Sequence, residues 1–200
     1  MTLRTYQKNQ NQENQGYTLN KMNVIIVHGK ADNKEDNPVG HWMPWIKKEL
    51  ERRKINVSIT LMPESWKPDY CSWKKEFMKY PLDKGTVLIG HSCGCAFLVR
   101  WLGETKKKIN KLVLVAPWKI PEIENEKEFY DYKIDKCVKK NSKEVIIFTS
   151  NNEENNGKES VKIFHNSLDG EIIELKNHGH FTLEDMGTEE FPELLNKVIE

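Results

Sequence analysis

The most constraining feature of this sequence is a regular alternation of short apolar runs with longer amphipathic stretches. Each apolar run is four to six residues long, and most are rich in Val and Ile, which is typical of strands buried on both faces of a parallel sheet. The predicted strands are Met22–Val27, Val57–Leu61, Thr86–Ile89, Lys111–Val115, Glu144–Thr149 and Glu171–Leu175. Helix-length stretches lie at Trp42–Arg53, Tyr70–Lys79, Cys93–Gly103, Glu124–Cys137, Lys158–Asn166 and Glu189–Ile199. Strands joined by helices predict a three-layer α/β domain with a mostly parallel sheet of about six strands.

The chain length predicts a single domain, because chains of roughly 100 to 200 residues usually fold around one core. Residues Met1–Lys21 are rich in Gln, Asn and Lys. Such a segment buries too little apolar surface to offset the entropy lost on ordering. We therefore expect a disordered tail over Met1–Lys21 and one domain over 22–200.

Charge and hydropathy argue against several classes of function. The chain has 31 basic and 30 acidic residues, so no net field attracts it to nucleic acid or to an anionic membrane. Apolar runs such as Leu112–Ala116 are far shorter than the roughly 20 residues that span a bilayer. The N-terminus has no apolar signal core, and the four cysteines form no Cys-x-x-Cys pair that would indicate a zinc site or a disulfide framework. We expect a cytoplasmic protein that binds neither nucleic acid nor membrane.

A nucleophile-elbow motif follows the third predicted strand and reads Gly90-His91-Ser92-Cys93-Gly94. It matches G-x-S-x-G between a strand and a helix. A serine in such a sharp turn leaves no room for a Cβ two residues away on either side, so glycines flank it. The start of the following helix offers a backbone N–H to an oxyanion. The motif predicts Ser92 as nucleophile and the N–H of Cys93 as one oxyanion donor.

The partners that would activate this serine are expected after the fifth and sixth strands, in the chain order Ser, acid, His. Two histidines, His178 and His180, follow the sixth strand, and we favour His180 as the general base. The loop after the fifth strand contains no Asp but offers Glu153 and Glu154. We favour Glu153 as the acid that orients the histidine, the alternative being a solvated glutamate in an Asn-rich turn.

The loop after the first strand, His28-Gly29-Lys30, should supply the second oxyanion donor through the N–H of Lys30. We expect His28 to be a structural residue that hydrogen-bonds the loop rather than a catalyst, and we count it among the possible residues of the substrate pocket. This loop lacks the glycine patterns of a P-loop or a dinucleotide site. The histidines of the last loop could join His28 or His41 around a metal, but no H-E-x-x-H or carboxylate-rich spacing accompanies them. We predict no cofactor and no metal.

Several separated blocks carry a family resemblance: Val27-His28-Gly29, His41-Trp42-Met43-Pro44-Trp45, Leu61-Met62-Pro63, Gly90 to Cys95, and His178-Gly179-His180-Phe181. Over about 22–200 they resemble the small serine hydrolases related to retinoblastoma-binding protein nine and their bacterial YdeN-like branch. The resemblance implies a compact α/β-hydrolase without the early antiparallel strands and with a Ser, Asp, His triad. By position, it places the nucleophile at Ser92 and the base at His180.

The acid position departs from the family pattern. The family's acid lies in a Ser-x-Asp-Asp stretch, and this chain has Asn152 and Glu153 where the two aspartates would stand. If the second aspartate is the catalytic one, Glu153 replaces it conservatively. If it is the first, Asn152 would hold the histidine less well and activity would fall.

Aromatic residues are candidates for a substrate pocket. The resemblance suggests that His41 and Trp42 lie close to the crevice, where the Trp42 indole would either form a substrate wall or pack on the sheet. For Trp45 we expect packing, because it lies three residues from Trp42 on the same helix face. Trp118 would either line the acyl or leaving-group side or pack beneath the segment 120–132.

Taken together, these residues predict a serine hydrolase that acts on a small-molecule carboxylic ester or activated amide through an acyl-enzyme. The alternative is a catalytically weak hydrolase scaffold that binds a protein partner, motivated by the altered acid and by the family's association with protein binding. A metal-dependent enzyme would instead contain bound metal and lose activity with a chelator.

Overall fold

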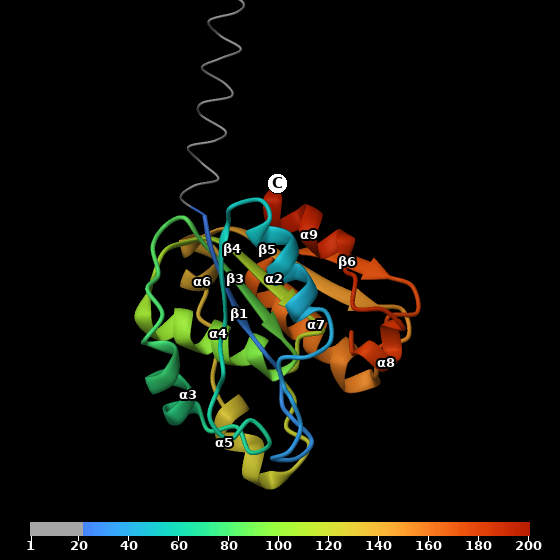
Figure 1. Ribbon diagram of the computed structural model, residues 1–200. Coiled ribbons are helices and arrows are strands. Elements are labelled where there is room, and N and C mark those ends of the chain that lie inside the picture. The colour runs from blue at the N-terminus through green and yellow to red at the C-terminus, as the bar shows by residue number, and fades with distance from the viewer. Residues whose placement is uncertain (1–21) are drawn as a thin grey trace, which may run out of the picture.

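The computed structural model describes residues 22–200, and the tail expected over Met1–Lys21 lies outside the described residues. Six strands form one sheet in the order β2-β1-β3-β4-β5-β6, and every neighbouring pair is parallel (Figure 1). The strands are β1 (Asn23–Val27), β2 (Asn56–Ile59), β3 (Thr86–His91), β4 (Ile109–Val115), β5 (Ser142–Ser150) and β6 (Glu171–Leu175). The expected α/β fold with six strands is confirmed.

Both faces of the sheet are covered, which explains the continuous apolar runs within its inner strands. Successive side chains of a strand point to opposite faces, so in β1 the residues Val24 and Ile26 belong to one core layer and Ile25 and Val27 to the other. All six residues of β3 are buried. A strand buried on both faces has no polar alternation, which is the pattern that the sequence shows.

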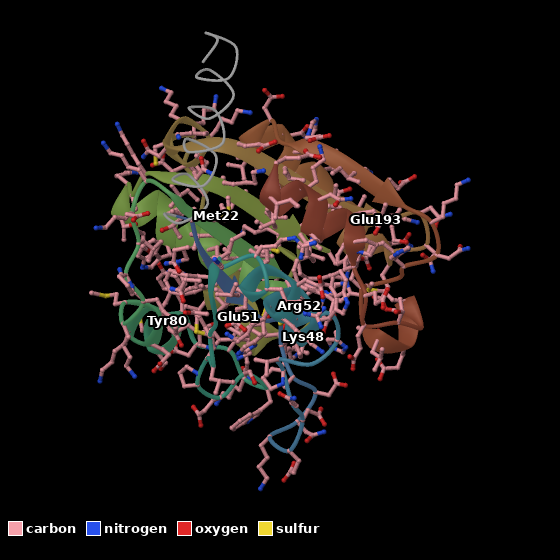
Figure 2. All side chains as sticks on the ribbon, turned by 45° about the horizontal axis from the view of Figure 1, so that its top comes forward. Met22, Lys48, Glu51, Arg52, Tyr80 and Glu193 are labelled. Carbon is pink, nitrogen blue, oxygen red and sulfur yellow. The ribbon has the colours of Figure 1, made fainter. Side chains whose placement is uncertain are left out.

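Helices α2 (Met43–Glu51) and α9 (Pro192–Ile199) cover one face of the sheet. Helices α3 (Tyr70–Phe77), α4 (Cys93–Thr105), α6 (Cys137–Asn141) and α7 (Asn155–Leu168) pack on the other (Figure 1). The helix α2 is amphipathic: Met43, Ile46 and Leu50 are buried, whereas its outer side carries the exposed charges that Figure 2 labels, Lys48, Glu51 and Arg52. No helix in the described part of the chain is long and apolar enough to cross a bilayer.

The prediction of a single helix over Glu124–Cys137 was wrong. The segment forms a 3₁₀ turn η1 (Glu124–Glu126) and a short helix α5 (Lys127–Tyr130), and only its last residue enters α6. The backbone leaves the helical region at Asp131 (φ −79°, ψ 78°). This break lets the Tyr132 hydroxyl donate to the carbonyl of Ala96 at 2.8 Å and buries Ile134 against α4. Tertiary packing therefore overrides the local helical pattern.

The strand order reverses between β1 and β3, because the chain moves outward to β2 and then returns to the other side of β1. Loops at the carboxyl ends of strands diverge at such a point and leave a crevice, which is where open α/β sheets bind ligands. The loop after β1 and the start of α4 meet here. A further short helix, α8 (Leu183–Met186), which the sequence did not predict, follows the loop after β6.

Candidate active site

Ser92 lies in a strained turn between β3 and α4. Its backbone angles, φ 52° and ψ −124°, are rarely adopted by residues other than glycine. Three hydrogen bonds hold this conformation: the N–H of Ser92 donates to the Val115 carbonyl, and its own carbonyl accepts from the N–H groups of Cys95 and Trp118. The surrounding sheet and helix thus fix the direction in which the Ser92 hydroxyl leaves the backbone.

Close backbone approach explains the glycines around this turn. A Cβ added to Gly94 would lie 2.5 Å from the carbonyl oxygen of His28 and 2.6 Å from that of Val27. A Cβ added to Gly29 would lie 2.9 Å from the Cβ of Ser92. The loop after β1 therefore packs directly on the nucleophile turn, and only glycine fits at these two positions.

His180 lies on the loop between β6 and α8, and its backbone is anchored on both sides. Its N–H donates to Asp185 Oδ2 at 2.8 Å, and its carbonyl accepts a hydrogen bond from the His91 ring Nε2 at 2.9 Å. The His180 ring packs edge-on against Trp118, with 5.4 Å between the ring centroids. These contacts leave a quarter of the His180 side chain exposed, so the ring reaches the pocket while its backbone is fixed.

Glu153 is the acid that lies beside this histidine. Its carboxylate oxygens Oε2 and Oε1 lie 3.0 and 3.2 Å from His180 Nδ1. The Glu153 side chain is completely buried, and Oε1 also accepts the N–H of Glu154 at 2.9 Å. Gly157 on the first turn of α7 makes room for it, because a Cβ there would lie 2.7 Å from the Glu153 carboxyl carbon. A carboxylate in this position can fix His180 in the tautomer whose Nδ1 carries the proton.

Asn152 has a different set of contacts. Its Oδ1 accepts the N–H of Gly179 at 2.9 Å and the hydroxyl of Ser150 at 2.5 Å. The Ser150 hydroxyl oxygen in turn accepts the N–H of His178 at 2.9 Å. Asn152 therefore supports the backbone of the histidine loop, while Glu153 accepts the hydrogen bond from the His180 ring. Glu154 lines the pocket outside this contact.

Two backbone N–H groups are the candidate oxyanion donors: that of Cys93, which follows Ser92 in the chain, and that of Lys30, a residue that lines the same pocket as Ser92. The N–H of Cys93 is the first of α4 and has no partner within the helix. Among the described residues, no protein acceptor takes the N–H of Lys30. Lys30 and Glu126 both line the pocket that Ser92 lines, and Lys30 Nζ lies 2.5 Å from Oε1 of Glu126, a residue of η1 with a buried side chain. Burial lowers the pKa of Lys30, but Glu126 and Glu122 outweigh this effect and the net pKa is raised.

His91 is buried beside the nucleophile and joins its turn to the histidine loop. Its ring lies 5.4 Å from that of His180 and 5.9 Å from the indole of Trp42. Burial, with smaller contributions from neighbouring histidines, lowers the pKa of His91 to about 3. The neutral ring can donate from Nε2 to the His180 carbonyl at all physiological pH values.

Ser92 and His180 line two adjoining pockets, of about 330 and 430 Å³. Trp118 lines the first pocket and His41 the second. Trp42 has no exposed surface and packs on His91 and Phe191, so the expectation of a Trp42 substrate wall needs correction: this indole belongs to the core. His28 is likewise buried and cannot itself form pocket surface, but it does hydrogen-bond the loop as expected.

Sequence reasoning missed the residues that support the histidine loop. Asp185 accepts the N–H of His180, and Thr182 caps α8 by accepting the N–H of Asp185 at 3.2 Å. The Thr182-Leu-Glu-Asp185 spacing is a capping pattern that could have indicated this helix start. The carbonyl contact of His91 had no sequence signal, because it joins positions 89 residues apart.

The described residues 22–200 contain no group of three or more His, Cys, Asp or Glu side chains arranged to hold a metal ion. The histidines near the pocket have other partners. His41 Nδ1 accepts the N–H of Leu183 at 2.9 Å, and His178 Nδ1 lies 2.7 Å from the Lys176 carbonyl.

Comparison with known proteins matches residues 24–199 to the model of one family, described as serine hydrolase. The chain belongs to the serine hydrolase family. This serine hydrolase is 26% identical over 176 residues to YdeN of Bacillus subtilis (strain 168), covering 84% of the chain and 90% of YdeN.

Solved structures show the same fold. The crystal structure of the ydeN gene product superposes on this serine hydrolase with a TM-score of 0.79 at 24% identity, covering 89% of this chain and 97% of the other. Est1E from Butyrivibrio proteoclasticus, solved with ferulic acid bound, gives a TM-score of 0.64 at 12% identity, with 90% and 88% of the two chains covered. The α/β-hydrolase fold implied by the sequence is thereby confirmed.

Proposed function

We propose that this protein hydrolyses carboxylic esters or activated amides of small molecules through an acyl-enzyme, with Ser92, His180 and Glu153 as its triad. The observation that best supports this proposal is the contact of the buried Glu153 carboxylate with His180 Nδ1 at 3.0 Å. His180 lines the same pocket as Ser92. A serine hydroxyl is a weak nucleophile until a base removes its proton, and an oriented histidine is the usual base.

In the proposed reaction, Ser92 Oγ attacks the substrate carbonyl carbon while His180 Nε2 takes the hydroxyl proton. The oxyanion of the tetrahedral intermediate accepts hydrogen bonds from the N–H groups of Lys30 and Cys93. The intermediate collapses when His180 returns the proton to the leaving alcohol or amine. Water then attacks the acyl-enzyme while His180 takes one of its protons. His180 passes this proton to Ser92 Oγ as the ester bond breaks, which releases the acid and free Ser92. Glu153 accepts the hydrogen bond from His180 Nδ1 and stabilises the imidazolium in both steps.

Labelling with a fluorophosphonate probe tests this proposal, because the probe reacts with an activated serine. We expect the wild type to label and Ser92→Ala to lose labelling. His180→Asn should abolish turnover of a short-chain 4-nitrophenyl ester. A folded wild type that neither labels nor turns over such esters would contradict the proposal and favour the alternative of a binding scaffold.

A further inference from the structure

The loop after β1 contains a buried histidine whose tautomer follows from its contacts. The ring Nε2 of His28 lies 3.0 Å from the backbone N of Met62, and Nδ1 lies 2.7 Å from the carbonyl oxygen of Gly29. A backbone N–H can only donate, so Nε2 must accept and Nδ1 must carry the proton. The Nδ1–H of His28 therefore donates to the carbonyl of Gly29.

Holding this carbonyl also orients the next N–H. The peptide bond between Gly29 and Lys30 is trans, since the described residues contain no cis peptide. In a trans peptide the C=O and the following N–H point in opposite directions. With the Gly29 oxygen bound on the His28 side, the N–H of Lys30 points away from His28. Gly29 and Lys30 line the pocket that Ser92 also lines.

This peptide needs an external constraint because of Gly29. Glycine occupies both halves of φ space with similar ease, so the peptide that follows it can rotate at little cost. Other contacts hold the neighbouring groups: the N–H of Ala31 donates to the Ser65 carbonyl at 3.3 Å, and the Lys30 side chain pairs with Glu126. Among the contacts of the described residues, the His28 hydrogen bond is the one made by the Gly29–Lys30 peptide group itself.

We propose that His28 is a positioning residue of the oxyanion hole, which fixes the Gly29–Lys30 peptide so that the Lys30 N–H is directed at the substrate carbonyl oxygen. This inference rests on the proposed function, because it assigns the Lys30 N–H to that reaction. It predicts that His28 acts on the transition state and barely on ground-state binding, since an oxyanion forms only during the reaction.

The test compares His28→Asn with His28→Leu. Both variants remove the ring acceptor of the Met62 N–H, but Asn places an amide N–H close to the position of Nδ1 and Leu does not. We expect Leu to lower kcat on a 4-nitrophenyl ester by about a hundredfold, the typical effect of losing one oxyanion donor, with KM changed by less than about twofold. The kcat of His28→Asn should be roughly tenfold higher than that of His28→Leu.

A second readout separates positioning from general destabilisation. An alkylboronic acid forms a tetrahedral adduct on a catalytic serine, so its inhibition constant should rise in His28→Leu by about the same factor as kcat falls. His165→Leu is the matched control, because His165 Nδ1 also lies 3.0 Å from a backbone carbonyl, that of Gly170, at the far end of α7. This control should leave kcat and boronate inhibition unchanged. Equal kcat values for folded His28→Asn and His28→Leu, or an effect confined to KM, would overturn the inference.

The tautomer can be measured in the wild type, so the test does not depend on a variant that folds or on catalysis. Nitrogen-15 NMR of the His28 ring should show protonated Nδ1 and unprotonated Nε2, with a scalar coupling across the hydrogen bond to the Gly29 carbonyl carbon. A protonated Nε2 would overturn the inference even in an enzyme that labels at Ser92. A wild type with the expected tautomer but no labelling would instead contradict the proposed function.

Discussion

The carboxylate of Glu153 lies 3.0 Å from Nδ1 of His180, and the Glu153 side chain is completely buried at this contact. The longer side chain of Glu is accommodated because Gly157 of α7 leaves space beside the carboxyl group. Glu153 thus reaches His180 from a loop that carries no aspartate.

Glu153→Gln should therefore lower kcat by about three to four orders of magnitude with little change in KM. The amide N–H would donate to Nδ1 and stabilise the tautomer with protonated Nε2, which cannot accept the Ser92 proton. Steady-state kinetics on a 4-nitrophenyl ester measure this effect. Glu159→Gln, at an exposed position of α7 away from the pocket, is the control and should keep activity within about twofold. If both variants lost activity equally, Glu153 would not be the specific partner of His180.

Asn152→Ala should weaken the histidine loop without removing any triad residue. The N–H of Gly179 and the hydroxyl of Ser150 would lose their acceptor, which costs about 1–2 kcal/mol of stability and displaces His180. We expect kcat to fall by roughly tenfold. Asn152→Asp keeps the acceptor oxygen and should preserve most activity, whereas Asn166→Ala, at an exposed position of α7, should match the wild type. A larger loss for Asn152→Asp than for Asn152→Ala would contradict this role.

Gly94→Ala should strongly destabilise the protein, because the new Cβ would lie 2.5 Å from the His28 carbonyl oxygen, where no backbone atom can give way cheaply. Overpacking of this kind costs about 1–3 kcal/mol or more. Chemical denaturation measures the loss. Gly40→Ala provides the comparison, since its Cβ would make an ordinary 3.6 Å contact and should change stability by less than about 0.5 kcal/mol. Similar stability of the two variants would show that α4 does not pack on the loop after β1 as described.

Stability should fall as the pH drops from 7 to 5, and His91 should account for much of the change. Burial holds the pKa of folded His91 at about 3, whereas the unfolded histidine has the ordinary value of 6.5. Below pH 6.5 the unfolded chain therefore binds the extra proton, which favours unfolding. Between pH 7 and 5 this group contributes about 2 kcal/mol of lost stability.

His91→Gln cannot titrate, so its free energy of unfolding should vary less with pH over this range. His28 and His41, whose pKa values are also lowered by burial, remain in the variant and keep part of the slope. Urea unfolding at several pH values provides the measurement. An identical slope for wild type and His91→Gln would refute the assignment.

The sequence by itself determined the sheet, because strands buried on both faces appear as continuous Val- and Ile-rich runs whatever surrounds them. It also predicted where the candidate site lies, because Ser92, His180 and Glu153 each follow a strand and the carboxyl ends of parallel strands meet at one edge of the sheet. The choice between Glu153 and Asn152 depended on side-chain direction, which only the packing of α7 and the histidine loop fixes. The same holds for the burial of Trp42 and the break at Asp131, since both result from contacts between segments distant in the chain, for which no local pattern exists.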